Sequence, residues 1–280
     1  MIEIDFTPGP MERLLDYVIE HYLNIEGLCP NTGLSVDRPQ CVKCNYERHR
    51  GGGKPLYSCQ NFRKVYLIRF LITHTKQTCD LIRRTIISDI AKIPNLFVVS
   101  FGGGPGVEAL ALMELLRHYD GKYDFVFDNV DRELSWQPIY QDLVRTFSGW
   151  IKNVDVNPRF SQIDVTGDFL AKQYDIVFVP WILSELDKEG RHRVLSRARD
   201  LTQPSKYVVV TDRPESALIR KISESITSIQ AWDVIKSEPK FKKHCGIHFP
   251  DDLRAKFRAQ VEYSTAYWVL KKHEVQDVPF

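Results

Sequence analysis

Hydrophobic residues follow two different spacings along this chain. Up to about residue 93 they recur every three or four positions, as on one face of a helix, in residues 10–23, 60–73 and 76–90. The stretch 27–58 lacks this spacing and contains several prolines and glycines, so we expect an irregular loop there. Residues 1–93 are therefore predicted to form a mainly helical N-terminal cap.

From residue 94 to residue 280, apolar runs of strand length alternate with helical segments. The expected strands are residues 96–101, 123–130, 160–165, 174–179, 206–211, 233–237 and 262–270. The expected helices are residues 107–119, 139–150, 189–201, 216–229 and 250–259. This alternation predicts a doubly wound, mostly parallel seven-stranded α/β sheet with helices on both faces. Because only a short helix separates the last two strands, we expect an antiparallel last strand in an edge hairpin.

The composition is that of an ordinary globular protein. The chain has 280 residues, 43% of them hydrophobic, and a formal net charge of +2, which excludes disordered, collagen-like and fibrous classes. No apolar run approaches the ~20 residues of a membrane-spanning helix. The acidic N-terminus lacks the basic and apolar regions of a secretory signal. We therefore expect an intracellular protein, cytoplasmic or nuclear, that has no membrane partner.

A glycine-rich loop follows the first expected strand. Residues 100–106 read Ser-Phe-Gly-Gly-Gly-Pro-Gly, and the next helix is expected to start directly after them. Gly102, Gly104 and Gly106 allow positive φ angles and close approach of the backbone, and the helix N-terminus offers unpaired N–H groups. Such a loop can hold a nucleotide-like ligand above the carboxyl ends of parallel strands.

An acidic residue stands at the end of the next strand. Asp131 lies 25 residues beyond Gly106, near the spacing of roughly 20 residues expected for a carboxylate that binds ribose hydroxyls. Asp128 is the alternative, but the apolar run ends at Val130, which favours Asp131. Both carboxylates could also simply be solvated at the end of a strand.

With these features, the chain from about residue 95 to residue 272 resembles the class I, Rossmann-like S-adenosylmethionine-dependent methyltransferases. Residues 100–106 look like the family's first motif, and Asp131 looks like its second-strand acid. Asp164 is similar to the third-strand residue near the adenine, and residues 174–186 match the fourth strand and its turn. The resemblance implies S-adenosylmethionine as cofactor, held by Ser100, Gly102, Gly103, Gly104, Gly106, Asp131, Asp164, Val165 and Val179.

Two positions depart from the family pattern. Ser100 stands where the family often has an acidic residue near the methionine amino group. The fourth-strand turn reads Val-Pro-Trp-Ile at residues 179–182 instead of Asp/Asn-Pro-Pro-Tyr/Phe, which argues against amino groups on planar bases or glutamine amides as acceptors. A nicotinamide dehydrogenase would use a similar loop, but the Gly-Gly-Gly-Pro-Gly form and the terminal hairpin favour the methyl donor.

The family places its substrate at the exit of the fourth strand, which makes Pro180, Trp181, Ser184 and Glu185 the candidate catalytic residues. Methyl transfer from a sulfonium requires mainly alignment of acceptor and methyl, sometimes with a base. Trp181 could stack on a planar substrate or belong to the core. Glu185 could be a base, although capping of the following helix is the simpler interpretation.

Positive charge is concentrated in the N-terminal region. Between Arg38 and Arg84 there are eleven basic residues and two acidic ones, a local charge of +9, interleaved with tyrosines and phenylalanines. Such a segment suits a polyanion whose bases can stack, and RNA is the partner it favours. The alternative is a solvated helical surface whose aromatic side chains are core.

Four of the six cysteines, Cys29, Cys41, Cys44 and Cys59, fall within 31 residues. Four thiolates can bind zinc tetrahedrally and fix a loop that otherwise lacks structure. Only one Cys-x2-Cys pair is present, and His49 is a substitute ligand. The thiols could instead be free or packed as small hydrophobes.

Three functions are compatible with these observations. The first is a methyltransferase that acts on RNA or another extended anionic substrate. The second is a methyltransferase with a small-molecule or protein substrate. The third is a methyltransferase-like protein that no longer catalyses and serves as a binding or scaffold protein, an alternative that Ser100 keeps open.

Overall fold

The computed structural model describes residues 9–29, 32–50, 56–167, 172–229 and 232–273, except for the side chains of residues 49 and 50. Its centre is one seven-stranded sheet with the order β3-β2-β1-β4-β5-β7-β6. The strands are β1 Asn95–Phe101, β2 Tyr123–Asp131, β3 Val154–Gln162, β4 Tyr174–Pro180, β5 Thr202–Asp212, β6 Trp232–His244 and β7 Glu262–Lys272.

Pairing in the sheet is parallel from β3 through to β5. By contrast, β7 runs antiparallel to both of its neighbours, β5 and β6. The predicted fold, a mostly parallel seven-stranded α/β sheet with an antiparallel last strand, is confirmed. The last strand lies inside the sheet, however, and β6 forms the edge of the hairpin.

Helical segments surround this sheet. They are α1 Pro10–Tyr22, α2 Arg38–Arg50, α3 Gln60–Tyr66, the π-helix η1 Leu67–Leu71, α4 Ile72–Thr85, α5 Ile87–Ile90, α6 Val107–Leu116, α7 Gln137–Ser148, α8 Lys188–Leu201, α9 Ser216–Thr227 and α10 Asp251–Phe257. Two short 3-10 helices, η2 Leu134–Trp136 and η3 Leu183–Glu185, follow β2 and β4. None of the described helices is long and apolar enough to cross a membrane.

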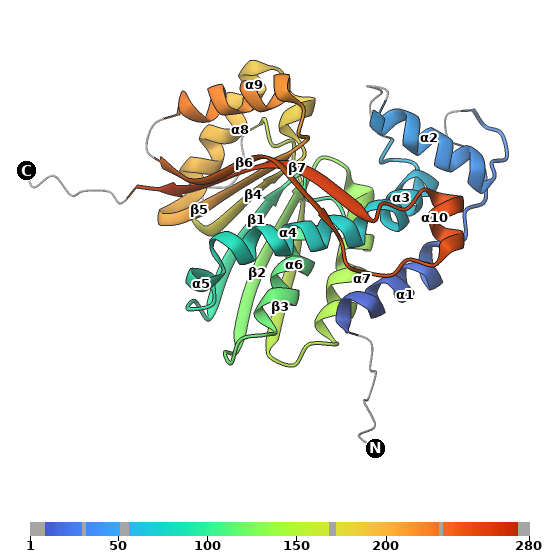
Figure 1. Cartoon of the computed structure of the whole chain (residues 1–280), viewed down its shortest axis with the longest axis horizontal. Coiled ribbons are helices and arrows are strands. Elements are labelled where there is room, and N and C mark those ends of the chain that lie inside the picture. Colours follow the sequence, from blue (N-terminus) through green and yellow to red (C-terminus); the bar gives the residue numbers. More distant parts are fainter. Residues whose placement is uncertain (1–8, 30–31, 51–55, 168–171, 230–231, 274–280) are drawn as a thin grey trace, which may run out of the picture.

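Each face of the sheet has its own helical layer. Successive side chains on a strand point to opposite faces. Val98 of β1 accordingly belongs to the apolar cluster that includes residues of α1, α4, α6 and α7, whereas Val99 belongs to the cluster that includes residues of α8 and α9. Figure 1 shows α8 and α9 on one side of the sheet and α4, α6 and α7 on the other. Helix α6 is buried along its whole length, which explains its almost uninterrupted apolar sequence.

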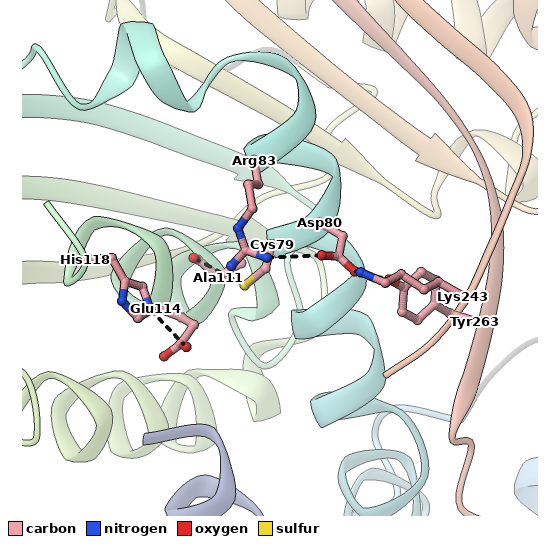
Figure 2. A network of polar contacts seen from close by, with 8 residues as sticks. All are labelled: Cys79, Asp80, Arg83, Ala111, Glu114, His118, Lys243 and Tyr263. Carbon is pink, nitrogen blue, oxygen red and sulfur yellow. Dashed lines mark hydrogen bonds and ion pairs between the residues drawn. The ribbon is translucent and has the colours of Figure 1, made fainter. Parts of the chain in front are cut away.

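The N-terminal helices share this core. The boundary expected after residue 93 falls between α5 and β1, yet one hydrophobic cluster joins Leu14 of α1 and Ile82 of α4 to Leu112 of α6. Helix α4 is also attached to the strands beside it. Asp80 accepts hydrogen bonds from Lys243 of β6, at 2.7 Å, and from Tyr263 of β7 (Figure 2).

Two sequence predictions were wrong. Residues 38–50, expected to be irregular, form α2. This helix buries only a few side chains, such as Cys41 and Val42, so it lacks an amphipathic pattern. The third strand begins at Val154 instead of residue 160. It is an edge strand whose residues are mostly exposed or half-buried, and its sequence therefore carries little apolar signal.

Candidate cofactor site

The glycine loop connects β1 to α6 and is tightly packed against its surroundings. Gly106 precedes α6 with a φ of 89°, and a Cβ atom there would lie 2.5 Å from Cδ2 of Tyr140. At Gly103 a Cβ atom would lie 2.0 Å from Oδ1 of Asn129. A side chain is thus excluded at Gly103 and at Gly106. Three loop amides donate within the protein, from Gly102 to the Val130 carbonyl, from Gly104 to Asp131 and from Gly106 to the Gly103 carbonyl, which fixes the shape of the loop.

Asp131 lies at the end of β2 directly beside this loop. Its Oδ2 accepts a hydrogen bond from the Gly104 amide at 3.0 Å, and its Oδ1 accepts one from the Glu133 amide at 2.9 Å. Burial raises the pKa of Asp131, and these backbone donors oppose the shift. Asp128, the alternative, is instead engaged by Tyr174 at the start of β4 and by Lys172 just before it.

A cavity of about 220 Å³ opens where these elements meet. It lies above the carboxyl ends of β1, β2 and β4, at the point where the strand order reverses direction. Nine of the predicted site residues line it: Gly102, Gly103, Gly104, Asp131, Asp164, Val165, Pro180, Trp181 and Glu185. The structure therefore brings residues from four separate chain segments to one site.

Four predicted site residues do not line the cavity. Ser100 and Val179 are fully buried in their strands, and Gly106 lies beneath the loop against Tyr140. Ser184 is turned away, because its amide donates to Oδ2 of Asp212 at 2.9 Å and its hydroxyl donates to the Trp181 carbonyl. These residues therefore support the glycine loop and the turn after β4 without facing the cavity.

The exit of β4 has an unusual backbone conformation. Trp181 has a φ of 58°, a left-handed conformation that is rare for a bulky residue. Its amide donates to the Thr211 carbonyl at 2.8 Å, which ties the turn to β5. The indole ring faces the cavity and stacks on His74 of α4, with ring centroids 4.9 Å apart and an angle of 14° between planes.

The N-terminal region supplies one wall of the cavity. Tyr57, Tyr66 and His74 line it together with Trp136 of η2. Tyr66 packs edge-on against Trp136 at 5.6 Å, and Tyr57 lies at 5.5 Å from the same ring. The sequence left open whether these tyrosines stack on RNA or belong to the core, and His74 was overlooked, although it follows Tyr66 by eight residues, about two helical turns.

Glu185 has a different role from the expected helix cap. The N-cap of α8 is Asp187, whose Oδ1 accepts from the Gly190 amide at 2.7 Å, so the capping interpretation of Glu185 was wrong. The Glu185 side chain is 34% exposed and pairs with Arg132 at 3.7 Å. Because both residues line the cavity, this pair lies at its wall.

Sequence reasoning also missed a carboxyl group in the first turn of α6. Glu108 lines the cavity but is only 3% exposed. The Ser100 hydroxyl donates to its Oε2 at 3.2 Å. Burial raises the pKa of Glu108 to about 7, and hydrogen bonds from its own amide and from Ser100 counter this only in part. The available signal was a glutamate in the first turn of a helical run whose only other charged residue is Glu114.

The four clustered cysteines line a second cavity, of about 390 Å³. Cys41 and Cys44 come from α2, Cys59 precedes α3, and Cys29 lies in the loop before α2. Burial raises the pKa of Cys41 to about 11, and the three other thiols add to the shift. In the parts of the chain that the structure describes, no three Cys, His, Asp or Glu side chains are arranged to hold a metal. His49 lies outside the described side chains.

Comparisons with known proteins give likenesses only at the level of structure. No family model matches the sequence, and no curated protein matches it. A magnesium protoporphyrin IX methyltransferase from Synechocystis with bound S-adenosylmethionine is 15% identical, covers 86% of this chain and all of its own, and has a TM-score of 0.49.

Two further solved structures are similar. A methyltransferase structure from Thermoplasma acidophilum is 15% identical over 65% of this chain and 70% of its own, with a TM-score of 0.43. The N-methyltransferase NodS from Bradyrhizobium japonicum, bound to S-adenosylhomocysteine, is 11% identical, covers 71% of this chain and 86% of its own, and has a TM-score of 0.44. At such low identity, function has to be argued from the geometry of the site.

Proposed function

We propose that this protein is an S-adenosylmethionine-dependent methyltransferase. The observation that carries the proposal is the meeting of the glycine loop and the fixed Asp131 carboxylate at one cavity, at the switch point of the sheet. The antiparallel β7 supports it, because a nicotinamide-binding sheet of the doubly wound type has no such inserted strand.

The residues present fit this cofactor. Asp131 would hold the ribose hydroxyls, the amides at the start of α6 would hold the methionine carboxylate, and Asp164 and Val165 would lie beside the adenine. When bound, the cofactor supplies an electrophilic methyl group on a sulfonium. The chain itself orients the acceptor against Trp181 and the N-terminal aromatic wall.

Binding of the cofactor can be tested by thermal unfolding with S-adenosylmethionine and S-adenosylhomocysteine. At ~100 times its dissociation constant, each ligand should stabilise the protein by about 2.7 kcal/mol. Asp131→Ala should abolish the shift. Asp124→Ala, which removes an exposed carboxylate from the other end of β2, should keep it. If the wild-type protein shows no shift at millimolar ligand, the scaffold function is favoured over the enzyme.

We further propose RNA as the acceptor. The support is the +9 charge between Arg38 and Arg84, together with aromatic rings that could stack on an unpaired base. Two of the basic residues, Arg63 and Arg69, are buried and bonded to protein atoms. Phosphate contacts would therefore be made by exposed side chains such as Lys43, which is 76% exposed.

The RNA proposal is tested by measuring affinity for single-stranded RNA at several salt concentrations. Each phosphate contact should contribute about −0.7 to the slope of log affinity against log salt. Lys43→Glu should make this slope shallower, whereas Lys122→Glu, on the far loop before β2, should leave it unchanged. Absence of binding at low salt would favour a small-molecule or protein acceptor instead.

We also propose that Cys29, Cys41, Cys44 and Cys59 bind a structural zinc ion. The zinc proposal is supported by the cavity that all four cysteines line, to which three chain segments contribute one or two thiols each. Metal analysis of the purified protein should give about one zinc per chain, lost in Cys44→Ser and kept in Cys79→Ser, whose thiol is buried beside α6. A zinc-free protein would show that these thiols are free or packed.

A further inference from the structure

Glu108 is a buried acid that faces the cavity without a cationic partner. It lies in the first turn of α6 with 3% of its surface exposed, and Ser100 donates the hydrogen bond that fixes its Oε2. Among the described residues, no positively charged group contributes to the pKa of this carboxyl. A buried carboxylate of this kind is unfavourable unless a positive group pairs with it.

The other titratable groups of the cavity are already engaged. Asp131 is held by two backbone amides, and Arg132 pairs with Glu185. His74 stacks on Trp181. Two further tyrosines, Tyr57 and Tyr66, and the exposed Asp164 complete the set. Since none of these pairs with Glu108, its positive partner is expected to come from the ligand.

We infer that Glu108, positioned by Ser100, binds the α-ammonium group of the cofactor's methionine end. This inference rests on the proposed cofactor. That cofactor carries two positive groups, the sulfonium and the ammonium. Its carboxylate suits the amides at the start of α6, and the ammonium is attached to the same carbon atom. An acid in the same first turn is therefore within reach of the ammonium, whereas the sulfonium lies several bonds further along the ligand.

The test uses two ligands that differ in their methionine end. S-Adenosylhomocysteine carries the ammonium but no sulfonium, and 5′-methylthioadenosine carries neither. Binding is measured by calorimetry on the full chain at pH 8. Glu108→Gln should lower the affinity for S-adenosylhomocysteine by about tenfold or more, and it should change the affinity for 5′-methylthioadenosine by less than about twofold. The double variant Ser100→Asp/Glu108→Gln, which returns a carboxylate to the same place, should restore much of the lost affinity.

Glu114 offers a matched control. It lies on the same helix, is 5% exposed, and pairs with Arg117 and His118 away from the cavity (Figure 2 shows the pair with His118). Glu114→Gln should leave both affinities unchanged. In the wild type, S-adenosylhomocysteine should bind up to about tenfold more tightly at pH 8 than at pH 6, as Glu108 ionises, and this dependence should vanish in Glu108→Gln.

Three results would overturn the inference. If Glu108→Gln lowers the affinity for both ligands equally, Glu108 only supports the loop. If the affinity for S-adenosylhomocysteine is unchanged, Glu108 does not contact the ammonium. If only the affinity for S-adenosylmethionine falls, Glu108 contacts the sulfonium instead. Failure of the proposed function is distinguishable from all three, because the wild-type protein would then bind neither ligand.

Discussion

Glu108 illustrates how one buried acid links stability to pH. Burial raises its pKa from the ordinary value of 4.5 to about 7 in the folded protein. Between these values the folded protein retains a proton that the unfolded chain releases. The stability that the neutral carboxyl contributes is therefore complete below pH 4.5 and is lost as pH rises through about 7. The shift corresponds to about 3 kcal/mol.

Glu108→Gln should therefore stabilise the ligand-free protein at pH 8 while it weakens ligand binding. We expect the free energy of unfolding in urea to rise by about 2–3 kcal/mol at pH 8 and to change little at pH 4.5, because glutamine mimics the neutral acid. An equal gain at both pH values would contradict this explanation and point to better packing. The same measurement on Glu114→Gln should show no gain at pH 8, since that acid is already paired.

Residue-level features of the site were only partly visible in the sequence. The glycines and Asp131 could be identified because their spacing is fixed by the strand and helix that follow. Glu108 and His74 could not be assigned, because the cavity they face is formed by distant segments. Their role depends on burial, which spacing alone does not determine.

At the scale of elements, helix α4 depends on a polar attachment in an otherwise apolar interface. Asp80 accepts from Lys243 and Tyr263 and pairs with Arg83 (Figure 2). Burial raises the pKa of Asp80, but these partners outweigh burial and the pKa is lowered from 3.8. The stability it contributes is thus present above pH 3.8 and is lost as pH falls through its lowered pKa.

Asp80→Asn should lower the melting temperature at pH 7, because it leaves Lys243 and Tyr263 without their charged partner. A loss of about 2 kcal/mol corresponds to a fall of roughly 4–8 °C in a chain of this size. Tyr263→Phe, which removes a single hydrogen bond, should cost about half as much. A melting temperature unchanged by Asp80→Asn would show that α4 is held by apolar packing alone.

Elements with a strong apolar period were predicted well, and those without one were not. The helix expected at residues 107–119 and the strand expected at 123–130 match α6 and β2 closely. Helix α2 was missed because it exposes most of its surface, and β3 was displaced because it is a half-exposed edge strand. The apolar period of a helix or strand exists because one of its faces is buried. An element that buries few side chains therefore lacks this period and is hard to predict from sequence.

At the scale of the whole molecule, the N-terminal region and the sheet share one hydrophobic core. Residues of α1 and α4 pack with α6 and with one face of the sheet. Expression of residues 94–280 alone should therefore give a protein without a cooperative urea transition, because a large apolar surface would be exposed. A sharp transition with wild-type slope would instead show that the two regions fold independently.

The sequence by itself determined the strand and helix succession, the glycine loop and the acid of the second strand, because local propensity and spacing are properties of the chain. Only the tertiary structure decided what surrounds the site. It brought Tyr66 against Trp136 and His74 against Trp181, paired Glu185 with Arg132, and buried Glu108 in the cavity wall. These contacts join segments far apart in the chain, and packing of the shared core, not spacing, sets them.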